Sequence, residues 1–220
     1  MKHLIKPIHP PNLGWLEKKL SDEEIKRLWK YIDNRGESVK DTLAGHVHES
    51  NSLIDEDGWF FKNTLLQLIY MYAGEFDNVG DKLPTPNKHP YFLSRMWVNY
   101  QKQCEYNPLH DHTGVYSFVI WMKIPTKQEE QDKISFSSEA NTKKNSTFQI
   151  LYNNILGQPT TITYYMNPEC EGTMFFFPSQ LQHQVYYLFY LKRHQSQFDL
   201  HQKIVLHLKM LFQKLEHLCV

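Results

Sequence analysis

The sequence predicts a mainly β domain, an antiparallel sandwich or barrel, with helices ahead of it in the chain. The 220 residues are 41% hydrophobic, which suffices for one substantial core and leaves little room for a second domain. From residue 91 onward, short segments rich in β-branched and aromatic residues are separated by Asn, Gly and Pro. We therefore expect a single domain, with helical support in residues 1–90, the β core in residues 91–190, and a tail in residues 191–220.

The composition bounds the partners of the protein. Lys plus Arg and Asp plus Glu each number 24, so the formal net charge is zero and no global field draws the chain to nucleic acid or to an anionic membrane. The three cysteines form no CxxC pair, which fits a reducing compartment. No segment approaches the roughly 18 apolar residues of a membrane span. We expect a soluble cytoplasmic protein, and the sequence leaves its oligomeric state open.

Two helices are expected in the first 90 residues. Ser21 and Glu24 stand at capping-box spacing, which predicts a helix over residues 22–33. Its apolar face is formed by Ile25, Leu28, Trp29 and Ile32.

A second helix is expected within residues 59–76, ending near Gly74. Residues 43–59 carry turn formers and are expected to form a loop between the two helices. Three prolines in residues 81–90 require an extended or turning backbone, and the strand region begins after them.

The strand region alternates strands with turns, and we expect residues 126–146, which are polar and charged, to form a solvated loop. The segment "VYSFVIWMKIP" is predominantly apolar, as is typical of a strand covered on both faces. Strands are expected in residues 91–103, 115–125, 146–157, 160–168 and 172–180.

The segment "NPLHDHTGVYSFVIWMKIP" places His110, Asp111 and His112 directly before that buried strand. Side chains at i and i+2 of an extended segment point the same way, so the two imidazoles face one side and Asp111 faces the other. His183, in "EGTMFFFPSQLQHQVYY", stands at the end of another apolar strand. A pair of ligands on one strand and a distant histidine on another have the spacing of a facial triad, which leaves coordination positions open.

A plainer interpretation stands beside this one. An HxH pair in a loop is more often simply exposed, and a single late histidine is more often a hydrogen-bonded strand residue. The combination favours a metal site because both histidine segments adjoin the most apolar strands of the chain. A nucleophilic hydrolase has less support because the chain has no GxSxG elbow, and glycine-rich phosphate loops are absent.

The segments "NPLHDHTGVYSFVIWMKIP" and "FQILYNNILGQPTTITYYMNPECEGTMFFFPSQLQHQVY" resemble a family of 2-oxoglutarate and Fe(II)-dependent oxygenases known largely from phage and bacterial genomes. The resemblance covers residues 43–187. It implies a double-stranded β-helix, a jelly-roll or cupin-like core, with Fe(II) as cofactor and 2-oxoglutarate as cosubstrate. It further implies a hydroxylase that produces succinate and CO2 and acts on an unidentified small molecule or protein side chain. For a phage-encoded protein the location would be the host cytoplasm.

The resemblance assigns His110 to the first ligand position and His183 to the distal one. In the wider superfamily the ligand at i+2 is a carboxylate, whereas this chain has His112 there. Strand geometry favours His112, and the charge balance of an Fe(II) site favours Asp111 as the alternative ligand. We take His112 as the third ligand, and we expect no catalytic residue beyond the metal ligands.

The same resemblance suggests residues for the cosubstrate. Such enzymes usually follow the distal histidine with a strand that carries an Arg and then a Ser, which bind the far carboxylate of 2-oxoglutarate. Arg193 and Ser196 stand at about these positions, and a guanidinium suits a carboxylate contact. On the strand before the histidine motif, Asn99 and Gln101 share a face and are expected to touch the cosubstrate.

The tail departs from the family after Tyr187. Apolar residues at helical spacing predict a C-terminal helix where the family closes its barrel with a strand. One hypothesis is that a reading-frame change removed that strand. Two alternatives to the hydroxylase stay open: a three-histidine cupin-type dioxygenase that does not use 2-oxoglutarate, and a catalytically inactive jelly-roll binding or structural protein. The apolar residues of the tail are Ile204, Leu208, Leu211, Leu215 and Leu218.

Overall fold

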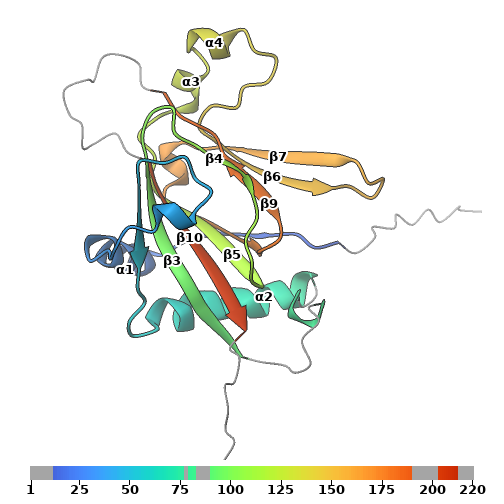
Figure 1. Cartoon of the computed structure of the whole chain (residues 1–220). Helices are drawn as coiled ribbons and strands as arrows, with labels where there is room; N and C mark the ends of the chain where they lie inside the picture. The colour runs from blue at the N-terminus through green and yellow to red at the C-terminus, as the bar shows by residue number, and fades with distance from the viewer. Residues whose placement is uncertain (1–11, 77–78, 83–89, 190–202, 213–220) are drawn as a thin grey trace, which may run out of the picture.

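Two antiparallel sheets form the body of the protein (Figure 1). The structure is a computed structural model that describes residues 12–76, 79–82 and 90–189, together with the backbone of residues 203–212. The six-stranded sheet has the order β1-β8-β5-β10-β3-β2, and the four-stranded sheet has the order β4-β9-β6-β7. The prediction of a mainly β domain with flanking helices is confirmed.

The chain crosses repeatedly between the sheets, since β3, β5, β8 and β10 belong to the larger sheet and β4, β6, β7 and β9 belong to the smaller one. This alternation is the winding of a jelly roll. The strands of the larger sheet are β1 (Leu16–Lys19), β8 (Thr173–Pro178), β5 (Tyr116–Lys123), β10 (Lys203–Phe212), β3 (Tyr91–Gln101) and β2 (Glu49–Leu53). The strands of the smaller sheet are β4 (Asn107–His110), β9 (Gln182–Val185), β6 (Thr147–Asn153) and β7 (Pro159–Tyr165).

Helix α1 (Asp22–Asp33) begins with the predicted capping box. The Glu24 amide donates to Ser21 Oγ at 3.3 Å, and the Ser21 amide donates to Glu24 Oε2 at 2.8 Å. Glu24 Oε1 also accepts hydrogen bonds from Lys18 and from the Thr64 hydroxyl, each at 2.6 Å. These bonds lower the pKa of Glu24 although its burial acts in the opposite direction. The local start signal of α1 therefore also fastens this helix to β1 and to the second helix.

The second helix is confirmed, and it extends two residues beyond Gly74. It opens with a π-helical turn, η2 (Phe61–Leu65), and continues as α2 (Leu66–Phe76). None of the described helices has the length and apolar character needed to cross a membrane. The remaining short helices are η1 (Lys40–Thr42), η3 (Val79–Lys82), α3 (Gln128–Gln131), α4 (Ser135–Ser138) and η4 (Pro168–Cys170).

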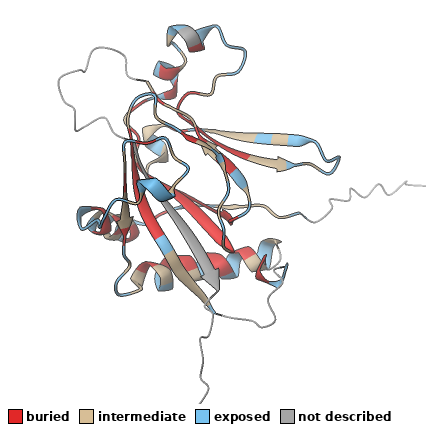
Figure 2. Ribbon diagram, in the orientation of Figure 1, coloured by how far each residue is buried: buried red, intermediate tan, exposed pale blue. Residues whose placement is uncertain are grey.

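Strand β5 is buried along nearly its whole length, as its predominantly apolar sequence predicts (Figure 2), and it contributes to two hydrophobic cores. Phe118 and Ile120 belong to the core under the helices, where the Phe118 ring meets Phe60 edge-on at 5.8 Å. Val119 and Trp121 belong to the core between the two sheets. Because alternate side chains of a strand point to opposite faces, one strand organises both layers.

The structure corrects several expectations about the connecting segments. The expected loop 43–59 contains β2, and the expected loop 126–146 contains α3 and α4. Residues 1–90 are not only helical, because β1 pairs with β8 and β2 pairs with β3. Strand β2 has the sequence ESNSL, which lacks the β-branched and aromatic residues that mark a strand. Its pairing with β3, and not its local propensity, determines its conformation.

The predicted C-terminal helix is wrong over Lys203–Phe212, which form β10. This strand lies between β3 and β5, with Leu206 opposite Val98 on one side and Ile120 on the other. The segment "KIVLHLKMLF" also alternates apolar residues at every second position, so the short run is compatible with either period. Because β10 pairs with β3 along one edge and with β5 along the other, this segment is a strand. The hypothesis that the final strand was lost is therefore wrong as well.

The central place of β10 predicts a strong effect of proline at position 206. Leu206→Pro removes a backbone donor between two partner strands, so we expect the free energy of unfolding to fall by about 3 kcal/mol or more. Leu206→Val, the matched control, keeps the donor and should stay within about 1.5 kcal/mol of wild type. Urea denaturation followed by tryptophan fluorescence measures both. Equal stability of the proline variant and wild type would contradict the central position of β10.

Candidate metal centre

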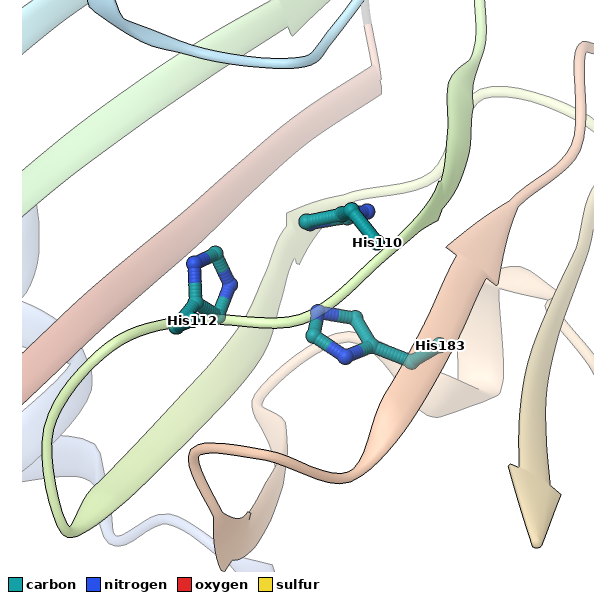
Figure 3. A group of neighbouring side chains, drawn as sticks. All are labelled: His110, His112 and His183. Carbon is teal, nitrogen blue, oxygen red and sulfur yellow. The ribbon is translucent and has the colours of Figure 1, made fainter.

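His110, His112 and His183 converge at the mouth of the jelly roll (Figure 3). His110 on β4 lies directly opposite His183 on β9 in the strand pairing. His112 follows β4, and its backbone amide donates to the Ser179 carbonyl at 2.8 Å, which ties the motif to the turn after β8. One ring nitrogen from each histidine lies within 4.8 Å of the others. The ring centroids are 4.3 Å apart for His110 and His183, 4.9 Å for His110 and His112, and 5.1 Å for His112 and His183.

Backbone carbonyls fix the tautomers of two of these rings. His110 Nδ1 lies 2.7 Å from the Pro108 carbonyl, and His183 Nδ1 lies 2.9 Å from the Leu181 carbonyl. A carbonyl only accepts, so each Nδ1 carries the hydrogen and each Nε2 keeps a lone pair. Neutral imidazoles with Nε2 free are the form that binds metal, and the carbonyl bonds set the ring orientation.

Burial favours the neutral form of the His110 and His183 imidazoles. It lowers the pKa of His110, and it lowers that of His183 further, where the neighbouring imidazoles act in the same direction. His183 is fully buried, and its Nε2 has no hydrogen-bond partner among the described residues. Aromatic rings surround the group, with Phe177 4.8 Å from His183 and Trp97 5.7 Å from His112.

The three residues therefore fit a metal ion of the kind that imidazole prefers, such as Fe(II). An unpartnered nitrogen at the buried end of the cluster is costly unless a ligand satisfies it. Asp111 is exposed, and the group of convergent ligand atoms contains His112 in its place. The extended backbone through the motif explains this arrangement, because residues at i and i+2 share a side.

A cavity of about 210 Å³ opens next to the histidines. Asn99, which we expect to touch the cosubstrate, lines this cavity. Gln101 does not line it, because its side-chain amide donates to the Glu105 and Tyr186 carbonyls and holds the turn after β3. Arg193 and Ser196, the predicted anchors of the far carboxylate, lie outside the described residues.

Sequence reasoning missed part of the cavity wall. Trp97 and Asn107 line it, as does the segment 42–45, which includes Gly45. Asn107 opens the histidine motif itself, so its place in the motif was the available signal. Segment 42–45 is remote in sequence and reaches the cavity because β2, which follows it, pairs with β3.

Residues 95–191 match the family model described as "Putative 2OG-Fe(II) oxygenase". The matched segment contains all three histidines and the strands from most of β3 through β9. Over this segment the chain is similar to the 2OG-Fe(II) oxygenases. A search of curated proteins finds no significant sequence match to the chain.

Several solved structures are similar to this chain. A prolyl-4-hydroxylase from Pseudomonas putida aligns with a TM-score of 0.51 and 10% identity over 91% of this chain and 94% of that one. A viral collagen prolyl hydroxylase from Paramecium Bursaria Chlorella virus-1 aligns with a TM-score of 0.46 and 12% identity over 89% of this chain and 94% of that one. A 2OG-Fe(II) oxygenase from Burkholderia pseudomallei aligns with a TM-score of 0.48 and 11% identity over 90% of this chain and 84% of that one. The first alignment supports the jelly-roll fold of this protein, and at 10% identity it supports the fold alone.

The depressed pKa of His183 predicts acid sensitivity of the metal-free protein. Below about pH 6.5 the unfolded chain protonates this residue while the folded protein keeps it neutral, so stability falls with pH. The loss for one group is at most about 1.4 kcal/mol per pH unit. We expect His183→Gln to flatten the decline between pH 6.5 and 5.5, and His46→Gln, at an exposed position, to leave it unchanged. Urea titrations with chelator present measure the free energy of unfolding at each pH. An equal decline of this free energy with falling pH in wild type and in His183→Gln would contradict the argument from burial.

Proposed function

We propose that this protein is an Fe(II)- and 2-oxoglutarate-dependent hydroxylase whose iron is held by His110, His112 and His183. One observation carries the proposal: three imidazoles converge inside the segment that matches the family, and the buried His183 Nε2 has no partner among the described residues. The carbonyl contacts at His110 and His183 support it, because they hold Nε2 ready as a ligand before any metal arrives.

Three protein ligands leave further coordination positions for a cosubstrate and dioxygen. When bound, iron and 2-oxoglutarate supply an oxidation in which one oxygen atom of O2 enters succinate, with release of CO2, and the other enters a substrate C–H bond as hydroxyl. The chain contributes the fixed imidazoles. It also contributes the aromatic packing of Phe177 and Trp97, which keeps the inner side of the site dry.

The ligand set determines the charge that the cosubstrate meets. Three neutral imidazoles leave the full double charge on Fe(II), whereas a ligand set that contains one carboxylate would reduce it. The keto-acid carboxylate of 2-oxoglutarate, placed beside the metal, would offset part of this charge, so a histidine at the third position would favour the binding of an anion. Asp111 is exposed at the rim of the cavity, where water screens its charge.

The cavity favours a substrate that presents only a small reacting group. Its volume of about 210 Å³ is below the roughly 300 Å³ at which pockets for drug-sized ligands begin. The exposed residues Thr42, Ala44 and Asp111 form part of its wall. A small molecule or a protein side chain, entering past these residues, suits this geometry.

The testing experiment is an anaerobic titration of 2-oxoglutarate into the Fe(II)-loaded protein, followed through the visible absorption of the iron–keto acid chelate. We expect saturable absorption for wild type and for Asp111→Ala. The variants His110→Ala, His112→Ala and His183→Ala should each bind iron at least tenfold more weakly, since each removes a ligand. His112→Asp, which restores a carboxylate at this position, should retain iron. Succinate formation after O2 is admitted measures turnover.

Each other result has a definite meaning. Loss of iron in Asp111→Ala with normal binding in His112→Ala would overturn the ligand set and assign Asp111 as the third ligand. Tight iron binding without absorption would favour the three-histidine dioxygenase that does not use 2-oxoglutarate. Failure to bind either iron or 2-oxoglutarate would favour a non-catalytic jelly-roll protein.

A further inference from the structure

Two buried asparagines line the cavity beside the histidines. Asn99 on β3 is 4% exposed, and Asn107 at the start of β4 is 6% exposed. Both line the same cavity as His110 and His112. A buried side-chain amide is expected to make hydrogen bonds at both its oxygen and its nitrogen. The partners of these two amides therefore indicate what the cavity is built to hold.

The orientation of Asn99 is set by a residue of the neighbouring strand. The Ser50 hydroxyl on β2 donates to Asn99 Oδ1 at 2.7 Å, and Ser50 is itself fully buried. This bond occupies the oxygen end of the amide. Asn99 Nδ2 makes no hydrogen bond within the part of the chain that the structure describes, so its two hydrogens remain for a ligand in the cavity.

Asn107 is positioned by a glycine in the opposite wall. The backbone of Gly45 lies so close that a Cβ there would overlap Asn107 Oδ1, and any residue with a side chain would displace the amide. The oxygen end of Asn107 therefore lies against Gly45, with the nitrogen end farther from it. Neither end makes a hydrogen bond to another described residue, so the amide remains available to a ligand in the cavity that it lines.

The segment that carries Gly45 is itself held in place. The His46 and Tyr106 rings stack at 5.0 Å and 4°, and their backbones form an isolated β-bridge. Arg95 donates to the Thr42 hydroxyl at 3.0 Å, and the His48 amide donates to Glu105 at 2.7 Å. The wall against Asn107 is thus built before any ligand binds, as preorganised sites require.

We propose that Asn99 and Asn107 donate their amide hydrogens to the keto-acid end of 2-oxoglutarate beside the metal, and that Ser50 and Gly45 orient these two donors. The inference rests on the proposed function and adds residues to it. Among the described residues that line the cavity there is no Lys or Arg, so neutral N–H donors are the groups available to an anion there. N–H donors to a carboxylate form strong, charge-assisted hydrogen bonds.

The test replaces each donor with an acceptor of the same shape. In Asn99→Asp and Asn107→Asp a carboxylate oxygen stands where the amide nitrogen was, and it repels the cosubstrate. We expect the Kd of 2-oxoglutarate, from the anaerobic absorption titration, to rise at least tenfold in each variant. Asn153→Asp, at the exposed end of β6, is the matched control and should keep the wild-type value. The melting temperature of each variant confirms that it is folded.

Gly45→Ala tests the positioning role separately. Its added methyl group displaces the Asn107 amide and touches no histidine ligand, so 2-oxoglutarate should bind at least threefold more weakly while the Kd of iron alone stays at the wild-type value. Ser50→Ala frees Asn99 Oδ1 and should likewise weaken 2-oxoglutarate without weakening iron. A loss of iron affinity equal to the loss of 2-oxoglutarate affinity would show a general structural effect and would overturn the positioning role.

The outcomes separate this inference from the function on which it rests. If wild type binds 2-oxoglutarate and both aspartate variants bind it with the wild-type Kd, the assignment of the asparagines is overturned and the hydroxylase proposal stands. If wild type itself gives no chelate absorption, the proposed function fails and this inference fails with it. Weakened binding in the aspartate variants, with the control unchanged, supports both.

Discussion

The pairing of β4 with β9 is the constraint on which the rest of the site depends. It places His110 opposite His183, although 72 residues separate them in the chain. Directly opposed residues of antiparallel strands lie on the same face with their Cβ atoms about 5 Å apart, so two imidazoles meet without any further device. His112 joins them because two residues along an extended backbone return to the same side. The six-stranded sheet then supports this pair from behind through the core between the sheets, which includes Trp121 and Phe175.

Local signals predicted those parts of the fold whose conformation local forces decide. Helix α1 was predictable to the residue because its capping box and its apolar period agree with each other. Strand β5 was predictable because a predominantly apolar run between turn formers has few alternatives in a small domain. Strand β2 and strand β10 were not predictable, since one has no strand composition and the other fits two periods. Both become strands through their pairing with β3, which is a tertiary cause that local sequence does not contain.

The same division explains which site residues could be found from the sequence. The histidines stand at strand boundaries in a recognisable order, so their spacing and the family resemblance suggested that they meet, and the pairing of β4 with β9 brings His183 to the other two. Asn99 could be suggested as a site residue because it shares a face of β3 with Gln101. Asn107 and Gly45 could not be paired in advance, because their contact requires β2 to lie beside β3 and the segment before it to fold across the cavity. Gln101, on the face of Asn99, bonds instead to the turn that its own strand enters.

Burial and charge explain why a histidine can occupy the third ligand position. The third position is half-buried, and the His112 ring lies 5.1 Å from that of the fully buried His183, so a carboxylate there would be partly removed from water, which is costly before the metal binds. A neutral imidazole carries no such cost, so the metal-free protein keeps a low-energy site whose rings are already oriented by main-chain carbonyls. The consequence falls on the ligands that arrive later: the positive charge left on the metal must be neutralised by an anion from outside, and the neutral amides of the cavity wall can orient that anion without cancelling its charge.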